Sequence, residues 1–277
     1  MGEAHPIRRL EALVRQHGDD LPLDSAMAAV AAVERPQLTD EEVRQPLDQL
    51  AERVSRKAEG VSDGGLDALR VVLFEEAGFA GRRERYYAPE NSLIDQVLAT
   101  RKGIPITLAV VWLEVARRAG LEAEGVGFPG HFLVRHRAGV VWRYVDVFDG
   151  GRVLTAADTQ QILTTMHGPD ARLETSMLEP VSNRALLTRV VLNLKNAYAM
   201  ADDLMGVVSA GDRLLALDED LHTERRDRGL AYARLGLASA ALADLREYLA
   251  RADPGRTERH GLEGLIPELE MRAAKMN

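Results

Sequence analysis

The chain has 277 residues, of which 46% are hydrophobic and 28% are charged, and its net charge at pH 7 is −8. This composition is typical of a soluble globular protein with room for two modest domains. The chain contains no cysteine, which excludes disulfides, thiolate–metal sites and cysteine nucleophiles. Acidic and basic residues are mixed, without a basic stripe interleaved with aromatic residues, so direct nucleic-acid binding is not expected.

The longest apolar run covers residues 104–116 and is interrupted by Glu114. A membrane span needs about 20 consecutive apolar residues, so this run predicts a buried helix and not a span. The N-terminal residues 1–6 contain no apolar signal core. We therefore expect a cytoplasmic protein without a membrane partner.

A helical period runs through the first 60 residues. Thr39 and Glu42 have the spacing of a capping box and predict a helix start. A loop at 60–65 breaks the pattern, and residues 66–76 predict another amphipathic helix.

Residues 81–103 read as irregular, apart from a helix that ends near Ala99 and is capped by Asn91 or Ser92. The most apolar helix follows, over about 105–119. Its start at Pro105 suits the first helical turn, where no amide hydrogen is needed. Its apolar residues cover nearly every face, so this helix is expected in the core.

The hydrophobic period then changes to two and predicts three strands at about 122–127, 131–137 and 140–147. They form an antiparallel sheet beside the core helix, which gives an α+β fold. A further helix is predicted at about 158–166, and the chain is helical in pattern from 181 onward.

The C-terminal tail shows the period of a tetratricopeptide repeat. Tyr198 and Tyr232 are 34 residues apart, and the residues around Tyr232 suit a helix hairpin better than those around Tyr198. One good and one degenerate repeat are expected, with the two tyrosines as candidate binding residues.

The strongest chemical signal is a histidine and an aspartate at the end of a predicted hairpin. If Ala138 and Gly139 form a two-residue turn, His131 lies directly opposite Asp146. Opposed side chains are close enough for a carboxylate to accept a hydrogen bond from an imidazole. A purely structural pair is the alternative, and the geometry alone favours it.

The nucleophile that would complete such a pair is missing. Thr107, in the first turn of the core helix, is a weak candidate and reads better as a cap or packing residue. Tyr86 and Tyr87 are expected to line a groove or to pack half-buried. His131 and His136 lie five residues apart on an alternating strand and face opposite sides, so no shared metal is expected, and no cofactor is predicted.

Several ordered stretches resemble the bacterial SirB-type proteins. They lie at 86–87, 89–93, 101–108, 116–121, 125–135 and 146–151, with further similarity in the tail at 226–230 and 244–249. The run at 128–135, Phe-Pro-Gly-His-Phe-Leu-Val-Arg, is specific. The resemblance adds Asn91 and Arg135 to the candidate binding residues.

The resemblance implies a papain-like or transglutaminase-like α+β core, with N-terminal helices and a tail of tetratricopeptide repeats. In catalytic members a cysteine starts the core helix, and a histidine and an aspartate come from adjacent strands. His131 and Asp146 match the last two positions, and the cysteine position falls at or near Pro105. The chain also has Val147 where the family's Asp-Pro-Phe has proline.

Two domains are expected: residues 1–175, with a core at about 86–165, and a repeat domain at 181–277. The missing cysteine and the repeats favour a non-thiol protein-interaction or regulatory module that binds protein partners through its cleft and its tail. The alternative is a hydrolase or peptidase-like enzyme in which His131, oriented by Asp146, activates water or Thr107. A third hypothesis gives the pair only a structural role.

Overall fold

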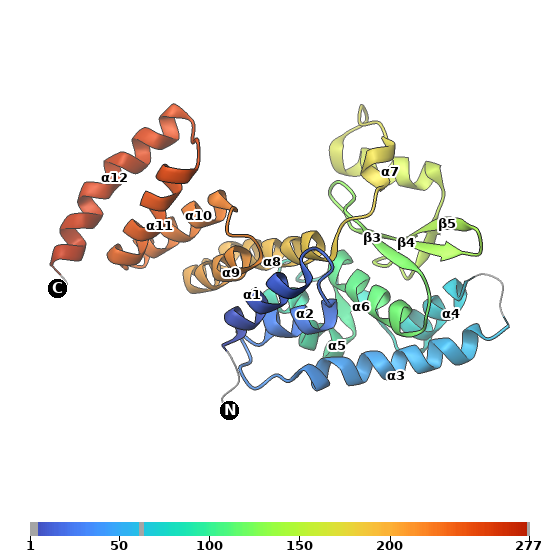
Figure 1. The fold of residues 1–277 in the computed structure, drawn as a ribbon. Coiled ribbons are helices and arrows are strands. Elements are labelled where there is room, and N and C mark those ends of the chain that lie inside the picture. The colour runs from blue at the N-terminus through green and yellow to red at the C-terminus, as the bar shows by residue number, and fades with distance from the viewer. Residues whose placement is uncertain (1–4, 61–63, 276–277) are drawn as a thin grey trace. The chain divides into compact units, whose positions relative to one another are not determined.

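The computed structural model describes residues 5–60 and 64–275 (Figure 1). The N-terminal residues 1–4 and part of the predicted loop at 60–65 lie outside the described residues. The chain divides into two compact units, Leu13–Val190 and a second unit that combines Met1–Ala12 with Val191–Asn277. Within the described part of the chain, no helix is long and apolar enough to cross a membrane.

Helices precede the sheet in the first unit, as predicted. They are α1 (Pro6–His17), which crosses the unit boundary, α2 (Leu23–Ala31), α3 (Asp40–Ala58), α4 (Leu66–Arg70) and α5 (Ile94–Thr100). The capping box that opens α3 is confirmed, because the Thr39 hydroxyl accepts from the Glu42 amide and the Glu42 carboxylate accepts from the Thr39 amide. The predicted helix at 66–76 changes type, since a π-helix at Val71–Glu76 follows α4.

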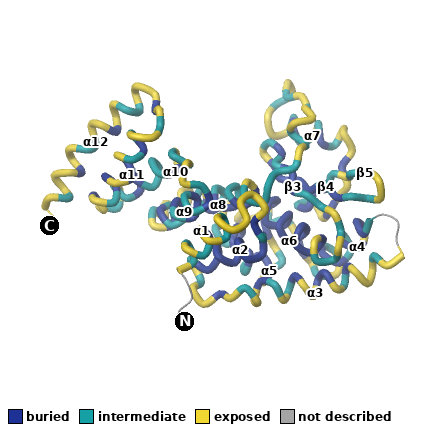
Figure 2. The backbone as a smooth tube through the Cα atoms, in the orientation of Figure 1, coloured by how far each residue is buried: buried dark blue, intermediate teal, exposed yellow. Residues whose placement is uncertain are grey.

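The predicted core helix is α6 (Pro105–Arg118), with Pro105 as its first helical residue. Every residue from Pro105 to Ala116 is buried, and α6 lies among the dark-blue segments of Figure 2. Helices α2, α3 and α5 pack against α6, as do strands β3 and β4. A helix that is apolar on all faces needs neighbours on all sides, and this arrangement supplies them.

The sheet has four antiparallel strands in the order β3-β4-β5-β6, and it confirms the α+β fold class. The strands are β3 (Ala123–Val126), β4 (Leu133–Ala138), β5 (Val141–Asp146) and β6 (Arg152–Leu154). The short β6 was not predicted, and neither was a parallel pair of two-residue strands, β1 (Ala80–Gly81) and β2 (Lys102–Gly103). The capped helix α7 (Ala156–His167) follows β6.

The predicted register of the β4–β5 hairpin was wrong by two residues. Ala138 pairs with Val141, so the turn consists of Gly139 and Val140 and not of Ala138 and Gly139. Two-residue hairpin turns favour a positive φ at the first central residue. Gly139 has a φ of 61° and takes that position at little steric cost.

The predicted side-chain cap of the helix ending near Ala99 was also wrong. A 3-10 helix at Pro89–Ser92 comes first, and the N-cap of α5 is Leu93, which has no side-chain cap bond. The Asn91 side chain instead donates to the carbonyl oxygens of Arg85 (2.7 Å) and Tyr86 (3.0 Å). Asn91 thus lies inside the 3-10 helix, two residues before the N-cap of α5, and its side-chain amide is held by the preceding loop.

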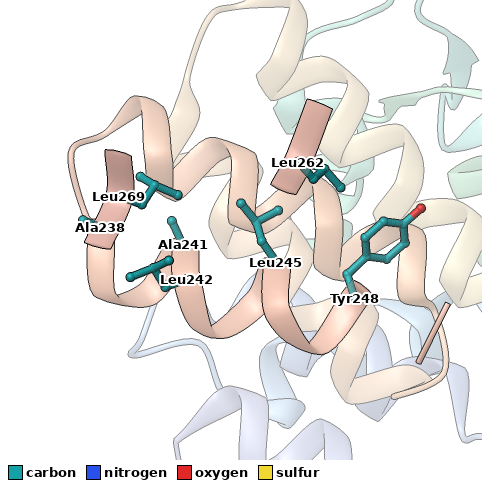
Figure 3. Close-up of a cluster of buried hydrophobic side chains, with 7 residues drawn as sticks. All are labelled: Ala238, Ala241, Leu242, Leu245, Tyr248, Leu262 and Leu269. Carbon is teal, nitrogen blue, oxygen red and sulfur yellow. The ribbon is translucent and has the colours of Figure 1, made fainter. Parts of the chain in front are cut away.

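The tail is all helical, as predicted. It consists of α8 (Asn183–Met200), α9 (Leu204–Leu217), α10 (His222–Arg234), α11 (Ala238–Arg251) and α12 (Arg256–Ala274), and α8 begins in the first unit. Figure 3 shows the buried cluster that joins the last two helices, formed by Ala238, Ala241, Leu242, Leu245, Tyr248, Leu262 and Leu269.

The α10–α11 hairpin depends on a small residue at Gly229. A Cβ at this position would lie 3.0 Å from the Asp244 Cβ and 3.0 Å from the Leu245 Cδ2. We expect Gly229→Ala to lower the free energy of unfolding by about 1–3 kcal/mol, measured by urea denaturation, because the helices must part. The control Gly261→Ala in α12, where a Cβ meets nothing within 4 Å, should be neutral or stabilising by up to about 1 kcal/mol. Equal effects of the two changes would contradict this account.

Candidate functional site

His131 and Asp146 meet despite the register error. The distance between His131 Nε2 and Asp146 Oδ2 is 3.1 Å, and the two side chains are 8% and 10% exposed. Asp146 is the last residue of β5, and His131 lies two residues before β4 begins. A slip of one residue moves side chains to the opposite face of a sheet, whereas a slip of two keeps them on the same face. The pair therefore forms although its members are not directly opposed.

The loop that follows β5 holds the Asp146 carboxylate. Its Oδ1 accepts from the backbone amides of Phe148 (2.9 Å) and Asp149 (3.3 Å), while Oδ2 faces His131. Burial alone would raise the pKa of Asp146. The hydrogen bond and charge interaction with His131 and the two amides outweigh that effect, and the pKa lies below its ordinary value.

This depressed pKa predicts an acid-sensitive contribution to stability. A carboxyl group whose pKa is lower in the folded state stabilises the fold above its unfolded pKa, and the contribution disappears as the pH falls through the folded pKa. We expect Asp146→Asn to be less stable than the wild type at neutral pH, and the difference to shrink below about pH 4. Urea denaturation at several pH values measures it, and a pH-independent difference would contradict the assignment.

The second ring nitrogen of His131 is available to a ligand. In the neutral imidazole, the bond to Asp146 places the proton on Nε2 and the lone pair on Nδ1. Within residues 5–60 and 64–275, Nδ1 has no hydrogen-bond partner. The His131 ring lines a cleft, so this lone pair is a base or acceptor at its wall.

The cleft has a volume of about 750 Å³. Its lining comes from the loop before α5, from the start of α6, from the loop between β3 and β4, from the end of β5 and the loop after it, from the start of β6 and from α7. The lining residues are Arg83, Tyr86, Tyr87, Pro105, Gly130, His131, Asp146, Phe148, Asp149, Arg152, Asp158, Gln161, Ile162, Thr165 and Met166.

Pro105 places the start of the core helix at this cleft, together with His131 and Asp146. The first turn of an α-helix has amides without intrahelical partners and the positive end of the helix dipole, which favour a thiolate or another anion. Here the first residue is a proline, which has neither an amide hydrogen nor a nucleophilic side chain. The cleft thus combines a histidine–aspartate pair with an inert residue at the helix start.

Thr107 lies two residues further along α6 and is fully buried. Its hydroxyl accepts from the Ile104 amide (3.1 Å) and is 2.9 Å from the Asn91 carbonyl oxygen, to which it donates. It is not among the residues that line the cleft. Its position is that of a helix cap that also fastens the 3-10 helix, which leaves no free hydroxyl for attack.

The predicted aromatic pair does line the cleft. The rings of Tyr86 and Tyr87 make an edge contact at 5.1 Å, and Tyr86 meets Phe148 at 6.0 Å. Phe148 also meets the His131 ring at 6.3 Å and lies under the Arg83 guanidinium at 5.1 Å. Asn91 contributes indirectly, since its bonds to the loop hold Tyr86 in place.

The other predicted binding residues lie elsewhere. Arg135 on β4 pairs with Glu124 and stacks on the Trp142 ring at 4.7 Å, and it does not line the cleft. Tyr198 is buried in α8, where its ring packs against the backbone of Gly206. Tyr232 is half-buried in α10, and burial raises the pKa of its hydroxyl.

Nothing in the described ranges 5–60 and 64–275 gathers three or more side chains that could hold a metal. His136 is fully buried, and its Nε2 lies 2.8 Å from the Gly64 carbonyl oxygen. It is therefore committed to the packing of the hairpin.

Sequence reasoning missed one arginine at this site. Arg189 of α8 donates to the carbonyl oxygens of Phe128 (3.0 Å) and His131 (2.7 Å). It also missed the α7 wall of the cleft. Arg189 and His131 are 58 residues apart, and a contact over that separation leaves no periodic or motif signal in a single sequence.

Two family models match the chain. Residues 41–192 match a family described as "Transglutaminase-like superfamily", and residues 194–266 match one described as "Tetratricopeptide repeat".

Relatives from bacteria match most of the chain. A UPF0162 protein of Xylella fastidiosa is 37% identical, over 83% of this chain and 84% of the relative. Protein SirB1 of Salmonella typhimurium is 27% identical, over 72% of this chain and 76% of the relative. F-box only protein 21 of Homo sapiens is 32% identical over 47% of this chain, which corresponds to 21% of that larger protein.

Proposed function

Because the chain belongs to the SirB-type family, in which a transglutaminase-like domain is joined to tetratricopeptide repeats, we propose that it is a protein-interaction module with a non-thiol cleft. Pro105 is the observation that carries the proposal. A proline starts the core helix in the cleft that His131 and Asp146 line, at or near the position where the resemblance to catalytic transglutaminase-like domains puts a cysteine. The site thus has the shape of an acyl-transfer centre without its nucleophile.

The walls of the cleft support binding of a protein segment. Tyr86 and Tyr87 are 36% and 60% exposed, and Met166 on the α7 side is 52% exposed. Aromatic residues and methionine are enriched at protein interfaces because they bury a large area at low conformational cost. A volume of about 750 Å³ accommodates several side chains of a partner.

The repeats support a second contact with a partner. Tetratricopeptide repeats stack helix hairpins into surfaces that bind peptides or helices. Three large apolar side chains of the tail are exposed beside its helix turns: Met200, Met205 and Leu237. The proposal therefore assigns partner binding to the cleft and to the repeat surface.

Site-specific photocrosslinking in cells tests this assignment. A photoreactive amino acid is placed at Tyr87 in the cleft, at Leu237 in the repeats, and at Val140 as the control. Val140 is 89% exposed and lies in the hairpin turn, outside both surfaces. We expect discrete adducts with the same protein at Tyr87 and Leu237 but not at Val140. Adducts at Val140 that match the other two in identity and yield would refute the proposed surfaces.

A hydrolase is the second candidate function, and the free Nδ1 of His131 favours it. This nitrogen would take a proton from a water molecule as the water oxygen attacks an ester or amide carbonyl, and the proton would then pass to the leaving group. Asp146 would hold the ring and stabilise the imidazolium. Ester and peptide libraries test this reading. An activity that survives both His131→Ala and Asp146→Asn would rule the pair out as its source.

A further inference from the structure

Arg189 joins helix α8 to the loop that carries His131. Its Nη2 donates to the carbonyl oxygens of Phe128 (3.0 Å) and His131 (2.7 Å). Its guanidinium also lies over the Phe132 ring, 5.5 Å from the centroid. One side chain therefore contacts three of the five residues from Phe128 to Phe132.

Apart from the buried rings of Phe128 and Phe132 and the bond between His131 and Asp146, the loop has few polar restraints. It connects β3 to β4 and contains Gly130 in the left-handed region, with a φ of 70°. Its internal backbone bonds run from the Phe128 amide to the Val126 oxygen (2.8 Å) and from the His131 amide to the Phe128 oxygen (3.1 Å). Hydrogen bonds from a charged donor are stronger than these neutral ones. Arg189 thus supplies the strongest polar contact to the backbone of His131.

The charge of Arg189 is directed to the loop and not to an ion pair. Across the described residues, 5–60 and 64–275, Arg189 has no salt-bridge partner. Burial lowers the pKa of its guanidinium, although a charge interaction with Tyr86 opposes this effect in part. A half-buried arginine without a carboxylate is costly. Its two carbonyl contacts are the compensation that the structure provides.

We propose that Arg189 is a positioning residue that holds the His131 imidazole toward Asp146 and the cleft. The inference rests on the proposed function only in taking His131 as the centre of the site.

The solvent exchange rate of the His131 ring N–H tests the role directly. The purified full chain is labelled with ¹⁵N-histidine, and the Nε2–H resonance is assigned by its loss in His131→Ala. We expect Arg189→Met to raise the exchange rate by about tenfold or more, because two charge-assisted bonds to the loop are lost. Arg189→Lys retains the positive charge but lacks the planar set of guanidinium donors, so it should give an intermediate exchange rate.

The matched control is Arg184→Met, the same chemical change on α8. The Arg184 side chain lies 3.0 Å from Asp19 and does not contact the loop that carries His131. The His131 ring N–H in Arg184→Met should therefore exchange at the wild-type rate. A folded Arg189→Met variant with an exchange rate within about twofold of the wild type would overturn the proposal. If Arg189→Met does not fold, the test uses Arg189→Lys, and a wild-type exchange rate in Arg189→Lys would also overturn the proposal. The measurement involves no partner protein, so a result that overturns the role of Arg189 would not contradict the proposed binding function.

Discussion

Arg118→Met is expected to lower the free energy of unfolding by about 3–5 kcal/mol. The Arg118 side chain is 10% exposed at the end of α6. It pairs with Asp24 of α2 (2.6 Å), with Asp48 of α3 (2.6 Å) and with Glu114 one turn earlier. Removal of the guanidinium leaves Asp24 and Glu114 as buried carboxylates with weaker compensation. Chemical denaturation with a fixed m-value measures the loss.

The neighbouring arginine provides the control for Arg118. Arg117 is 62% exposed and lies 3.0 Å from Glu114 and 3.9 Å from Asp24. Arg117→Met should therefore cost no more than about 1 kcal/mol, because exposed pairs are screened by solvent. A loss at Arg117 as large as that at Arg118 would show that burial does not determine the effect.

At acidic pH, the difference in the free energy of unfolding between the Arg118→Met variant and the wild type should become smaller. Burial would raise the pKa of Asp24, but the Ser25 amide and the charge of Arg118 lower it below the ordinary value. The stabilisation from Asp24 is present at neutral pH and is lost as the pH falls through its folded pKa. Once Asp24 is protonated, the absence of Arg118 matters less. A pH-independent difference would place the main effect outside this ion-pair network.

The sequence predicted the elements whose signals are local. The capping box at Thr39, the apolar stretch that begins at Pro105 and the helical tail all depend on neighbours within a few turns. The two-residue register error arose because Ala138-Gly139 and Gly139-Val140 are both possible two-residue turns. The φ of Gly139 distinguishes them, and a φ angle is not visible in a sequence.

Within the candidate site, the sequence could predict only the residues that lie in the recognisable stretches at 86–87, 101–108, 125–135 and 146–151. His131 and Asp146 belong to two of these stretches, and a two-residue slip leaves them on the same face. The remaining features depend on contacts between distant segments, such as Arg189 with the loop at 128–132 and α7 with Tyr86 across the cleft. The structural role of Thr107 was also out of reach of the sequence, because its hydroxyl donates to the carbonyl oxygen of Asn91, 16 residues earlier in the chain.

A cysteine placed at position 105 should become an activated thiol. Pro105→Cys puts a sulfur at the first residue of α6, in the cleft that His131 lines. A helix N-terminus and an adjacent imidazole both favour the thiolate, and such environments lower cysteine pKa values from about 8.5 to as little as about 3.5–7.5. We expect a thiol pKa at least about 1 unit below 8.5 and, at pH 7, a thiolate fraction about tenfold above that of an ordinary cysteine.

The chain makes this measurement simple, since it contains no other cysteine. The rate of alkylation by iodoacetamide is followed from pH 5 to pH 10, and the midpoint of the profile reports the thiol pKa independently of access to the cleft. The matched control is Ala156→Cys. It places a thiol at the first residue of α7, at an exposed position that has the helix terminus but does not line the cleft.

The double variant Pro105→Cys with His131→Ala separates the two causes. If the imidazole activates the thiol, the midpoint should return to that of the Ala156→Cys control, because only the helix terminus remains. If Pro105→Cys already has the midpoint of Ala156→Cys, position 105 is not within reach of His131, and the proline does not replace a nucleophile. A lowered midpoint that depends on His131 would show that this cleft keeps the electrostatics that activate a thiol at the start of α6, which Pro105 does not supply.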